Sequence, residues 1–117
     1  MNRILIAEDE ERLAAFIEKG LRRNGFVTAV VPDGEQALQM AEQFELLLLD
    51  LGLPIKDGWV VLKELRSQGK RLPIIIVTAF NDDDNLNSAF NLGANGYVTK
   101  PFRFSDLLQK VKSHFSG

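Results

Sequence analysis

The 117-residue sequence contains no cysteine, one histidine, one tryptophan and one tyrosine. The absence of cysteine excludes disulfides, thiolate metal sites and cysteine nucleophiles. No apolar run approaches the roughly 20 residues that a membrane-spanning helix requires. The apolar run near the N-terminus is also too short for the core of a signal peptide. We therefore expect a protein of the cytoplasm with no membrane partner.

The chain also lacks a strong excess of charge of either sign. Its 14 basic and 16 acidic residues give a net charge of −2, and no basic stripe is present. We therefore expect no direct nucleic-acid binding by this chain. Hydrophobic residues make up 45% and charged residues 26% of the sequence, which is typical of a globular protein. The length and the absence of repeats or linkers predict one domain over residues 1–117, with no further effector domain.

Short aliphatic runs without alternation predict strands that are buried on both faces, as in a parallel sheet covered by helices. The expected strands are residues 4–7, 26–30, 46–49, 74–77 and 96–98. Helical patterns and caps lie between them, at 11–24, 34–43, 58–68, 83–92 and 104–115. Strictly alternating strands and helices, joined by right-handed crossovers, predict a doubly wound α/β fold.

Details of the helices can also be predicted. Leu13, Phe16, Ile17 and Leu21 recur at helical spacing and are expected to face the core. Asp33 and Ser105 are the residue types that cap helix N-termini, so each is expected to cap the helix that follows it. The only histidine, His114, lies in the last predicted helix and is expected to be a surface residue.

Candidate site residues follow four of the five predicted strands, three of them directly. Glu8 and Asp9 follow the first strand, Asp50 the third and Thr78 the fourth, and Lys100 comes two residues after the fifth. Because the carboxyl ends of parallel strands share one edge of the sheet, these side chains should meet there. Each residue alone has a simpler explanation. Acidic residues such as Glu8 and Asp9 are common at the N-termini of helices, and Asp50 could form a turn. Thr78 could simply end a strand, and Lys100 could be a solvated surface residue. Their coincidence at one edge favours a site.

The chemistry of such a site can be argued from its charges. Clustered carboxylates repel each other unless cations compensate them. Lys100 supplies one positive charge, and Mg²⁺, which binds a few carboxylates and then a phosphate oxygen, would supply two more. A carboxylate beside a cation, a lysine and a hydroxyl is equipped to attack phosphorus and form an aspartyl phosphate.

Residues 1–115 resemble the receiver domain of bacterial two-component response regulators. The matching motifs are ILIAEDE at 4–10, DGEQAL at 33–38, LDLGLP at 49–54 with DG at 57–58, VTA at 77–79, and GANGYVTKPF at 93–102. The resemblance implies a flavodoxin-like fold of five βα units with strand order 2-1-3-4-5. It also implies that Lys100–Pro101 is a cis peptide bond.

The resemblance further implies the role of each site residue. Asp50 would accept the phosphoryl group, while Thr78 and Lys100 would each contact a phosphate oxygen. Tyr97 would turn inward when Thr78 moves toward the phosphate, which switches the face formed by the fourth helix, fifth strand and fifth helix. Mg²⁺ would be held by Asp9, Asp50 and the backbone carbonyl of Gly52, with Glu8 acting mainly through water.

The implied partners are a sensor histidine kinase or phosphotransfer protein, and an effector domain or downstream protein. The chain would not be an enzyme beyond its own phosphorylation and slow autodephosphorylation. It departs from the family members with winged-helix DNA-binding domains, which usually carry two acids where Asn95 and Gly96 stand. Those members also tend to have a basic residue at the position of Leu86. The charged dimer contacts of that subfamily are therefore not expected here.

Three other functions are alternatives to a phosphorylatable receiver domain. A flavin-binding protein of the same fold needs a Gly/Ser/Thr-rich loop after the first strand, where this chain has four acids. A phosphatase with an aspartyl nucleophile needs a second carboxylate two residues later, where Gly52 has none. A receiver-like interaction module that is never phosphorylated remains the alternative, although the intact site residues favour phosphorylation.

Overall fold

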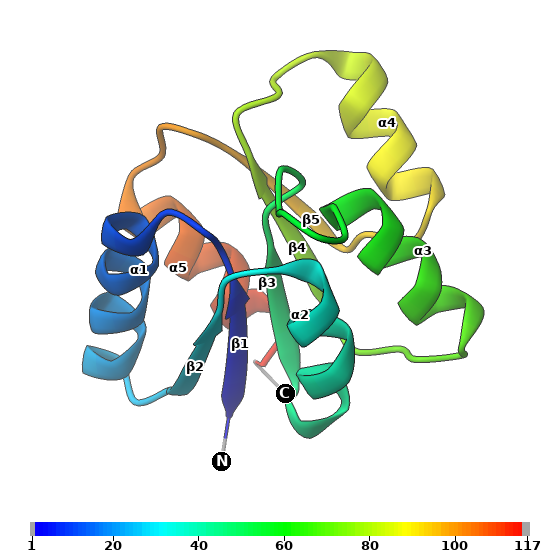
Figure 1. Cartoon of the computed structure of the whole chain (residues 1–117). Helices are drawn as coiled ribbons and strands as arrows, with labels where there is room; N and C mark the ends of the chain where they lie inside the picture. Colours follow the sequence, from blue (N-terminus) through cyan, green and yellow to red (C-terminus); the bar gives the residue numbers. More distant parts are fainter. Residues whose placement is uncertain (1, 116–117) are drawn as a thin grey trace.

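The computed structural model describes residues 2–115, which form five strands, five α-helices and one 3-10 helix (Figure 1). The strands are β1 (Arg3–Ala7), β2 (Val27–Val31), β3 (Leu46–Leu49), β4 (Ile74–Thr78) and β5 (Gly96–Thr99). The helices are α1 (Glu11–Arg23), α2 (Gly34–Met40), η1 (Ala41–Gln43), α3 (Gly58–Ser67), α4 (Asp83–Asn91) and α5 (Phe104–Ser113). The alternation predicted from the sequence is confirmed.

All neighbouring strands are parallel and follow the order β2-β1-β3-β4-β5, as predicted. Ile4 lies opposite Thr28 of β2 on one side and Leu46 of β3 on the other. The strand order therefore reverses between β1 and β3. Loops that leave these two strands diverge to opposite faces of the sheet, which opens a place for a ligand at their carboxyl ends.

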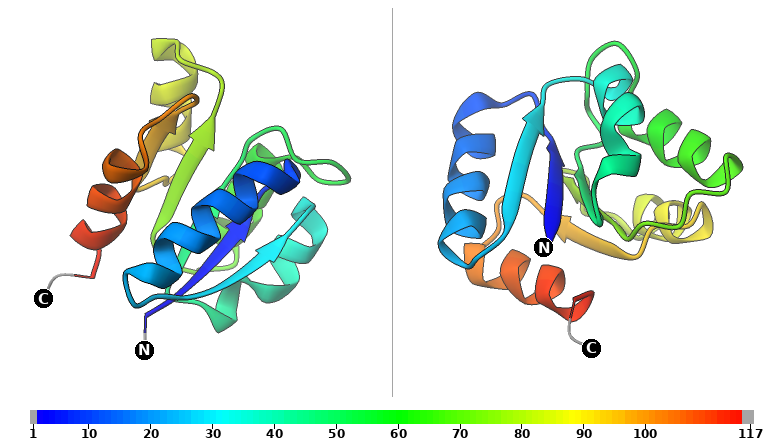
Figure 2. Two further views of the ribbon diagram at one scale, coloured as in Figure 1. Left: turned by 90° about the vertical axis from the view of Figure 1, so that its left-hand side faces the viewer. Right: turned by 90° about the horizontal axis from the view of Figure 1, so that it is seen from below.

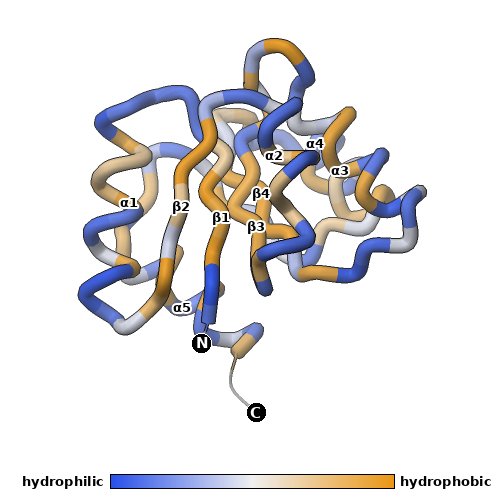
Figure 3. Tube along the Cα trace, turned by 60° about the horizontal axis from the view of Figure 1, so that its bottom comes forward, coloured by the Kyte–Doolittle hydropathy of each residue, from blue (hydrophilic) through white to orange (hydrophobic). Residues whose placement is uncertain are grey.

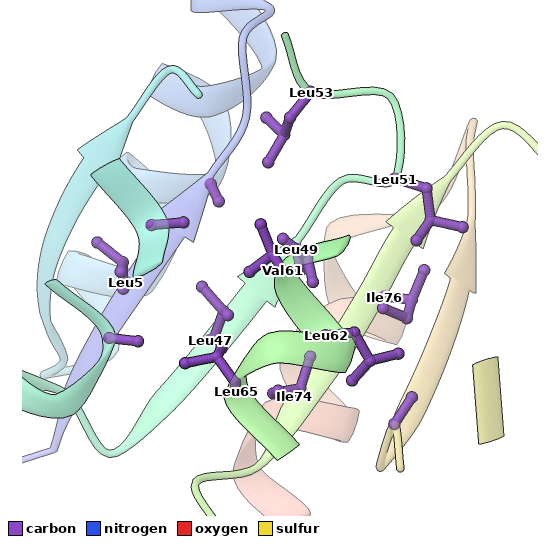
Figure 4. Packing of buried hydrophobic residues seen from close by; sticks show 14 of the residues in the cluster. Leu5, Leu47, Leu49, Leu51, Leu53, Val61, Leu62, Leu65, Ile74 and Ile76 are labelled. Atoms are coloured by element: carbon purple, nitrogen blue, oxygen red, sulfur yellow. The ribbon is translucent and has the colours of Figure 1, made fainter. Parts of the chain in front are cut away.

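Helices cover both faces of the sheet (Figures 1 and 2). Leu5, Leu47 and Ile76 pack under α2, α3 and α4, whereas Ile6, Leu48 and Ile75 pack under α1 and α5. Figure 4 shows the first of these clusters between the sheet and α3. The chain trace along β1, β3 and β4 is mainly hydrophobic (Figure 3) because residues 4–7 of β1 and all residues of β3 and β4 are buried. The edge strand β2 combines buried and exposed residues.

The structure confirms some predicted helix boundaries and corrects others. The Asp33 carboxylate accepts a hydrogen bond from the Gln36 backbone N–H at 2.8 Å, which caps α2 as predicted. The predicted cap at Ser105 is wrong. Helix α5 begins at Phe104 with Arg103 as its cap residue, and Ser105 already lies inside the first turn. The same helix ends at Ser113, where His114 forms the C-cap and is only partly exposed.

Phe16 does not face the core, contrary to the prediction. It is 52% exposed, whereas Ala14, Ile17 and Leu21 form the buried stripe of α1. The buried stripe follows 14, 17 and 21, and Phe16 lies beside it. Its ring instead makes an edge contact with the ring of Phe104, with centroids 5.9 Å apart. None of the helices within residues 2–115 is long and apolar enough to cross a membrane.

Candidate functional site

Three carboxylates meet at the carboxyl edge of the sheet, where the strand ends were expected to bring them. Glu8 and Asp9 follow β1 and Asp50 follows β3, and one oxygen of each lies within 4.8 Å of the others. Glu8 and Asp50 are buried, at 3% and 8% exposure, whereas Asp9 is exposed. Three acids so close require compensation by positive charge.

Lys100 provides part of that compensation from the loop after β5. Its Nζ lies 2.9 Å from Glu8 Oε1 and 3.5 Å from Asp50 Oδ2. Burial disfavours the charged lysine, yet its contacts with Glu8 and Asp50 outweigh burial and raise the pKa of Lys100. Burial likewise raises the pKa of Glu8, although Lys100 and the Glu10 backbone N–H act against this shift. The lysine therefore stays charged and pairs with both buried acids.

The loop after β3 holds Asp50 in a defined orientation. The Gly52 backbone N–H donates to Asp50 Oδ1 at 3.0 Å, and the Asp50 N–H donates to the Ala7 carbonyl of β1 at 3.1 Å. A Cβ built on Gly52 would lie 3.8 Å from Asp50 Oδ1 and within 4 Å of nothing else outside its chain neighbours. The space above this carboxylate is therefore open on the Gly52 side. Gly58 packs directly against the Asp50 carbonyl, which only a residue without a side chain allows.

The tip of the loop after β3 has a strained backbone and is held by ion pairs. Ile55 has a φ of 69° and is 77% exposed, and the flanking Lys56 N–H donates to the Pro54 carbonyl at 2.8 Å, which closes a tight turn. A β-branched residue rarely adopts this conformation. The Lys56 ammonium reaches Glu35 of α2 at 3.4 Å and Glu64 of α3 at 3.3 Å, so ion pairs brace the loop against two helices. The sequence motifs had not indicated this brace.

Thr78 and Tyr97 are linked through the loop after β4. The Thr78 hydroxyl accepts a hydrogen bond from the Phe80 backbone N–H at 3.2 Å, and the Tyr97 hydroxyl donates to the Phe80 carbonyl at 2.8 Å. Both side chains are buried, at 2% and 8% exposure. Burial raises the pKa of Tyr97, and Asp82 adds to the shift. Tyr97 therefore lies turned inward in this structure.

A second unpredicted contact set joins α3 to the loop between α4 and β5. The Arg66 guanidinium donates to the Gly93 carbonyl at 2.9 and 3.0 Å, and to Asn95 Oδ1 at 2.8 Å. It also donates to the Lys70 carbonyl at 2.9 Å. The Ile74 backbone N–H donates to the same Asn95 oxygen at 2.9 Å. This set fixes the C-terminal end of α4 far from the acidic cluster.

The residues present suit a hard divalent cation. Oxygen ligands from two or three carboxylates, with room for water and a phosphate oxygen, form the donor set that Mg²⁺ prefers. The three carboxylate oxygens are close enough to share one ion, and the open space at Gly52 leaves access to it. The Lys100–Pro101 bond is cis, as the resemblance implied, and the lysine next to it contacts both buried acids.

The fold and the site define a class of protein, a doubly wound α/β domain with an acidic, lysine-compensated site at its strand switch point. The family model for the response regulator receiver domain matches residues 4–112. The chain therefore belongs to the receiver domains of two-component response regulators.

Relatives and solved structures agree with this assignment. The chain is 41% identical over 113 residues to the transcriptional activator protein IrlR of Burkholderia pseudomallei, covering 95% of this chain and 49% of the relative. It is 38% identical over 113 residues to the regulatory protein HprR of Escherichia coli, covering 95% and 50%. The chain thus spans about half the length of the curated relatives it matches.

Two solved receiver domains have closely similar folds. A Francisella response regulator receiver domain superposes with a TM-score of 0.94 at 31% identity, covering 98% of this chain and 97% of that one. The BeF3-activated receiver domain of Klebsiella pneumoniae RstA superposes with a TM-score of 0.91 at 30% identity, covering 99% and 100%.

Proposed function

We propose that this receiver accepts a phosphoryl group on Asp50 from a histidine kinase or phosphotransfer protein, with Mg²⁺ bound beside it. The observation that carries the proposal is the environment of the Asp50 carboxylate. One oxygen lies 3.5 Å from the Lys100 ammonium, and the carboxylate shares an oxygen cluster with Glu8 and Asp9. This carboxylate is both accessible through the open side at Gly52 and surrounded by the charges that phosphoryl transfer requires.

Each site residue has a role that follows from its position. An Asp50 oxygen forms the new bond to phosphorus while the bond from phosphorus to the donor's nitrogen breaks. Lys100, held beside Asp50, would pair with a phosphoryl oxygen, and the Thr78 hydroxyl would contact another. Asp9, Asp50 and the Gly52 carbonyl would hold Mg²⁺, with Glu8 acting mainly through water. The ion supplies positive charge to the transferring oxygens.

Phosphorylation would then switch the face formed by α4, β5 and α5. Thr78 and Tyr97 both contact the backbone of Phe80, so a movement of Thr78 toward the phosphoryl group would pull on the loop that begins α4. The response is a shift between two packings, biased by the new phosphate contacts.

The wider role is proposed from the relatives, which are named as transcriptional regulators about twice the length of this chain. Residues 1–117 would act as one receiver domain of the cytoplasm, without direct contact to nucleic acid or membrane. Output would pass through an effector domain or a downstream protein. The chain would catalyse nothing beyond its own phosphorylation and slow dephosphorylation. A receiver-like interaction module that is never phosphorylated is the alternative that the following experiment tests.

Intact-mass measurement after treatment with acetyl phosphate and Mg²⁺ tests the proposal. Wild type should gain about 80 Da, one phosphoryl group, and lose the gain when Mg²⁺ is chelated. Asp50→Asn should gain nothing, whereas Asp57→Asn, a matched change at the cap of α3, should still be labelled. An adduct that persists on Asp50→Asn would overturn the assignment of the acceptor. Absence of any adduct on wild type would favour the unphosphorylated module.

A further inference from the structure

The loop between β3 and α3 carries two expected Mg²⁺ ligands near its start and a paired lysine near its end. Asp50 and Gly52 lie just after β3, whereas Lys56 lies just before Asp57, the N-cap of α3. The Gly52 N–H donates to Asp50 Oδ1 at 3.0 Å, so the loop backbone and the carboxylate are oriented together. A change in the course of this backbone would therefore displace both metal ligands.

The start of the loop is anchored by packing on either side of Gly52. Leu51 and Leu53 are buried in the core cluster under α3 (Figure 4), and the Gly58 N–H donates to the Leu51 carbonyl at 3.0 Å. Gly52 itself is exposed, and a Cβ built on it would meet only Asp50 Oδ1 within 4 Å outside its chain neighbours. The position of the Gly52 carbonyl therefore depends on where the rest of the loop holds Leu53.

The tip of the loop, residues 54–56, lies against the first turn of α2. The Gly34 N–H donates to the Pro54 carbonyl at 3.3 Å, and a Cβ on Gly34 would collide with the Lys56 carbonyl. Because Gly34 is the first residue of α2, only a residue without a side chain lets the tip approach the helix this closely. The loop is thus folded onto α2 directly after Leu53.

This conformation of the tip strains the backbone. Ile55 has a φ of 69°, which a β-branched side chain rarely adopts, and its side chain is 77% exposed. Burial of the side chain therefore contributes little to offset the strain. A strained backbone persists only where its surroundings hold it. The contacts of the tip with α2 and α3 must supply that stabilisation.

Lys56 links the tip to both helices at once. Its Nζ lies 3.3 Å from Glu64 Oε1 of α3 and 3.4 Å from Glu35 Oε2 of α2. The hydrogen bond with Glu64 is the main cause of the raised pKa of Lys56, and Glu35 adds to it, so the lysine is charged at neutral pH. A single exposed ion pair stabilises a protein only weakly, and salt screens it. Two pairs that share one ammonium and hold a strained turn should change a loop-dependent affinity a few-fold.

We propose that Lys56 is a positioning residue for Mg²⁺. Its ion pairs with Glu35 and Glu64 hold the loop after β3 in the conformation that presents Asp50 and the Gly52 carbonyl to the ion. This inference rests on the function proposed above. Lys56 acts through the loop backbone alone and touches neither the metal nor the phosphoryl group.

The sign of the effect on Mg²⁺ affinity separates positioning from simple charge repulsion. A lysine near a cation site repels the ion, so loss of its charge alone would strengthen Mg²⁺ binding. Loss of a lysine that positions the ligands would weaken Mg²⁺ binding instead. Lys56 and Lys100 should therefore act on the affinity in opposite directions.

Calorimetric titration of the unphosphorylated protein with Mg²⁺ tests this role. Lys56→Met removes the ammonium and keeps an unbranched side chain, and it should raise the Mg²⁺ dissociation constant about threefold. Lys56→Arg keeps a cation for both ion pairs and should bind Mg²⁺ as wild type does. The difference between wild type and Lys56→Met should shrink in about 1 M NaCl, where exposed ion pairs are screened.

Ile55→Asn in the Lys56→Met background tests the part played by the strained turn. Asn adopts a positive φ more readily than Ile, so the tip should need less support from the ion pairs. The second substitution should recover most of the Mg²⁺ affinity lost in Lys56→Met. A double variant that binds Mg²⁺ as weakly as Lys56→Met would overturn the claim that Lys56 acts by holding this turn.

Lys70→Met is the matched control. Lys70 forms an ion pair with Glu42 at 2.9 Å, but it lies before β4 and therefore at the opposite edge of the sheet. This variant should keep the wild-type dissociation constant, and urea unfolding shows that each variant is folded. An unchanged or lower dissociation constant in Lys56→Met, or an equal rise in Lys70→Met, would overturn the positioning role while wild type still binds Mg²⁺ and accepts a phosphoryl group. Wild type that binds no Mg²⁺ would overturn the proposed function as well.

Discussion

The Tyr97 hydroxyl donates a hydrogen bond to the Phe80 backbone carbonyl at 2.8 Å, which joins the middle of β5 to the loop before α4. The same Phe80 residue donates its N–H to the Thr78 hydroxyl at 3.2 Å. One loop residue thus contacts both side chains implicated in the switch. Since Ala89 is the only buried residue within α4, this loop is a main attachment of the helix at its N-terminal end.

Tyr97→Phe should loosen this attachment without disturbing the core. The variant keeps the buried ring and loses one hydrogen bond, so the free energy of unfolding should fall by about 1 kcal/mol. Amide hydrogen exchange over residues 79–86 should accelerate, while exchange in α1 stays constant. Equal exchange in the two proteins would show that the hydroxyl contact does not hold the loop.

Glu8→Gln should stabilise the metal-free protein at neutral pH. Burial raises the pKa of Glu8 above its ordinary value of 4.5, so the native state holds this proton more tightly than the unfolded chain. The ionised carboxylate therefore costs stability at pH 7, and this cost is removed as the pH falls through the raised native pKa toward 4.5. The free energy of unfolding of Glu8→Gln should exceed that of wild type by about 1 kcal/mol at pH 7.

The difference in the free energy of unfolding between Glu8→Gln and wild type should shrink as the solution is acidified, since protonation neutralises Glu8 in wild type. Urea unfolding at several pH values in EDTA measures this difference. Glu11→Gln provides the control, because Glu11 is an exposed acid in the first turn of α1. A variant less stable than wild type at pH 7 would mean that the ion pair with Lys100 outweighs desolvation.

Lys100→Met should bind Mg²⁺ more tightly than wild type. The ammonium lies 2.9 Å from Glu8 and 3.5 Å from Asp50, so it competes with a metal for the same negative charge. Its removal should lower the Mg²⁺ dissociation constant severalfold in calorimetric titration, and more at low ionic strength. Lys63→Met, at an exposed position on α3, should leave the Mg²⁺ dissociation constant unchanged. A weaker affinity in Lys100→Met would show that the lysine positions the carboxylates.

Asn95→Asp should stabilise the fold through Arg66. Both the Arg66 guanidinium and the Ile74 N–H donate to Asn95 Oδ1, so a carboxylate at this position would accept charge-assisted hydrogen bonds. We expect a gain of about 1 kcal/mol in urea unfolding. In a double-mutant cycle most of the gain should be lost when Arg66 is replaced by Met, because only the Ile74 N–H then remains as a donor. If the full gain in the free energy of unfolding survives this replacement, it does not come from Arg66.

The alternation of strands and helices and the acidic cluster were predictable because they depend on local patterns. Unbroken aliphatic runs identify buried parallel strands, and parallel strands necessarily bring their carboxyl ends to one edge. Glu8, Asp50 and Lys100 could therefore be assigned to one place before any coordinates were known. The cis bond at Pro101 and the strand order came from resemblance to the receiver family.

The sequence-based predictions were wrong or incomplete where contacts between residues far apart in the chain determine the structure. Helical spacing placed Phe16 with the core residues, but its ring packs on Phe104, far along the chain. Arg66 binds a carbonyl 27 residues away, at Gly93, and no pattern near Arg66 indicates that contact. The strained Ile55 could not be predicted either, because its positive φ is imposed by a loop held between α2 and α3.

Phe80→Glu should shorten the lifetime of the phosphoryl group on Asp50. Hydrolysis requires a water molecule in line with the acyl phosphate. Gly52 leaves that approach open, whereas Phe80 is an aromatic residue that cannot orient water by hydrogen bonding. The backbone of Phe80 is held by Thr78 and Tyr97, so its side chain has a defined starting point beside the site. We expect slow autodephosphorylation in wild type because the bulky ring shields the site.

The half-life of the phosphorylated protein is measured with Mg²⁺ and no phosphatase, after removal of the donor. Phe80→Glu should lose phosphate several times faster, because the carboxylate can accept a hydrogen bond from the attacking water. Phe90→Glu is the matched control, since Phe90 lies in α4 and is exposed to a similar degree, 43% against 48% for Phe80. If Phe80→Glu keeps the wild-type half-life, the open approach at Gly52 controls water access and Phe80 does not.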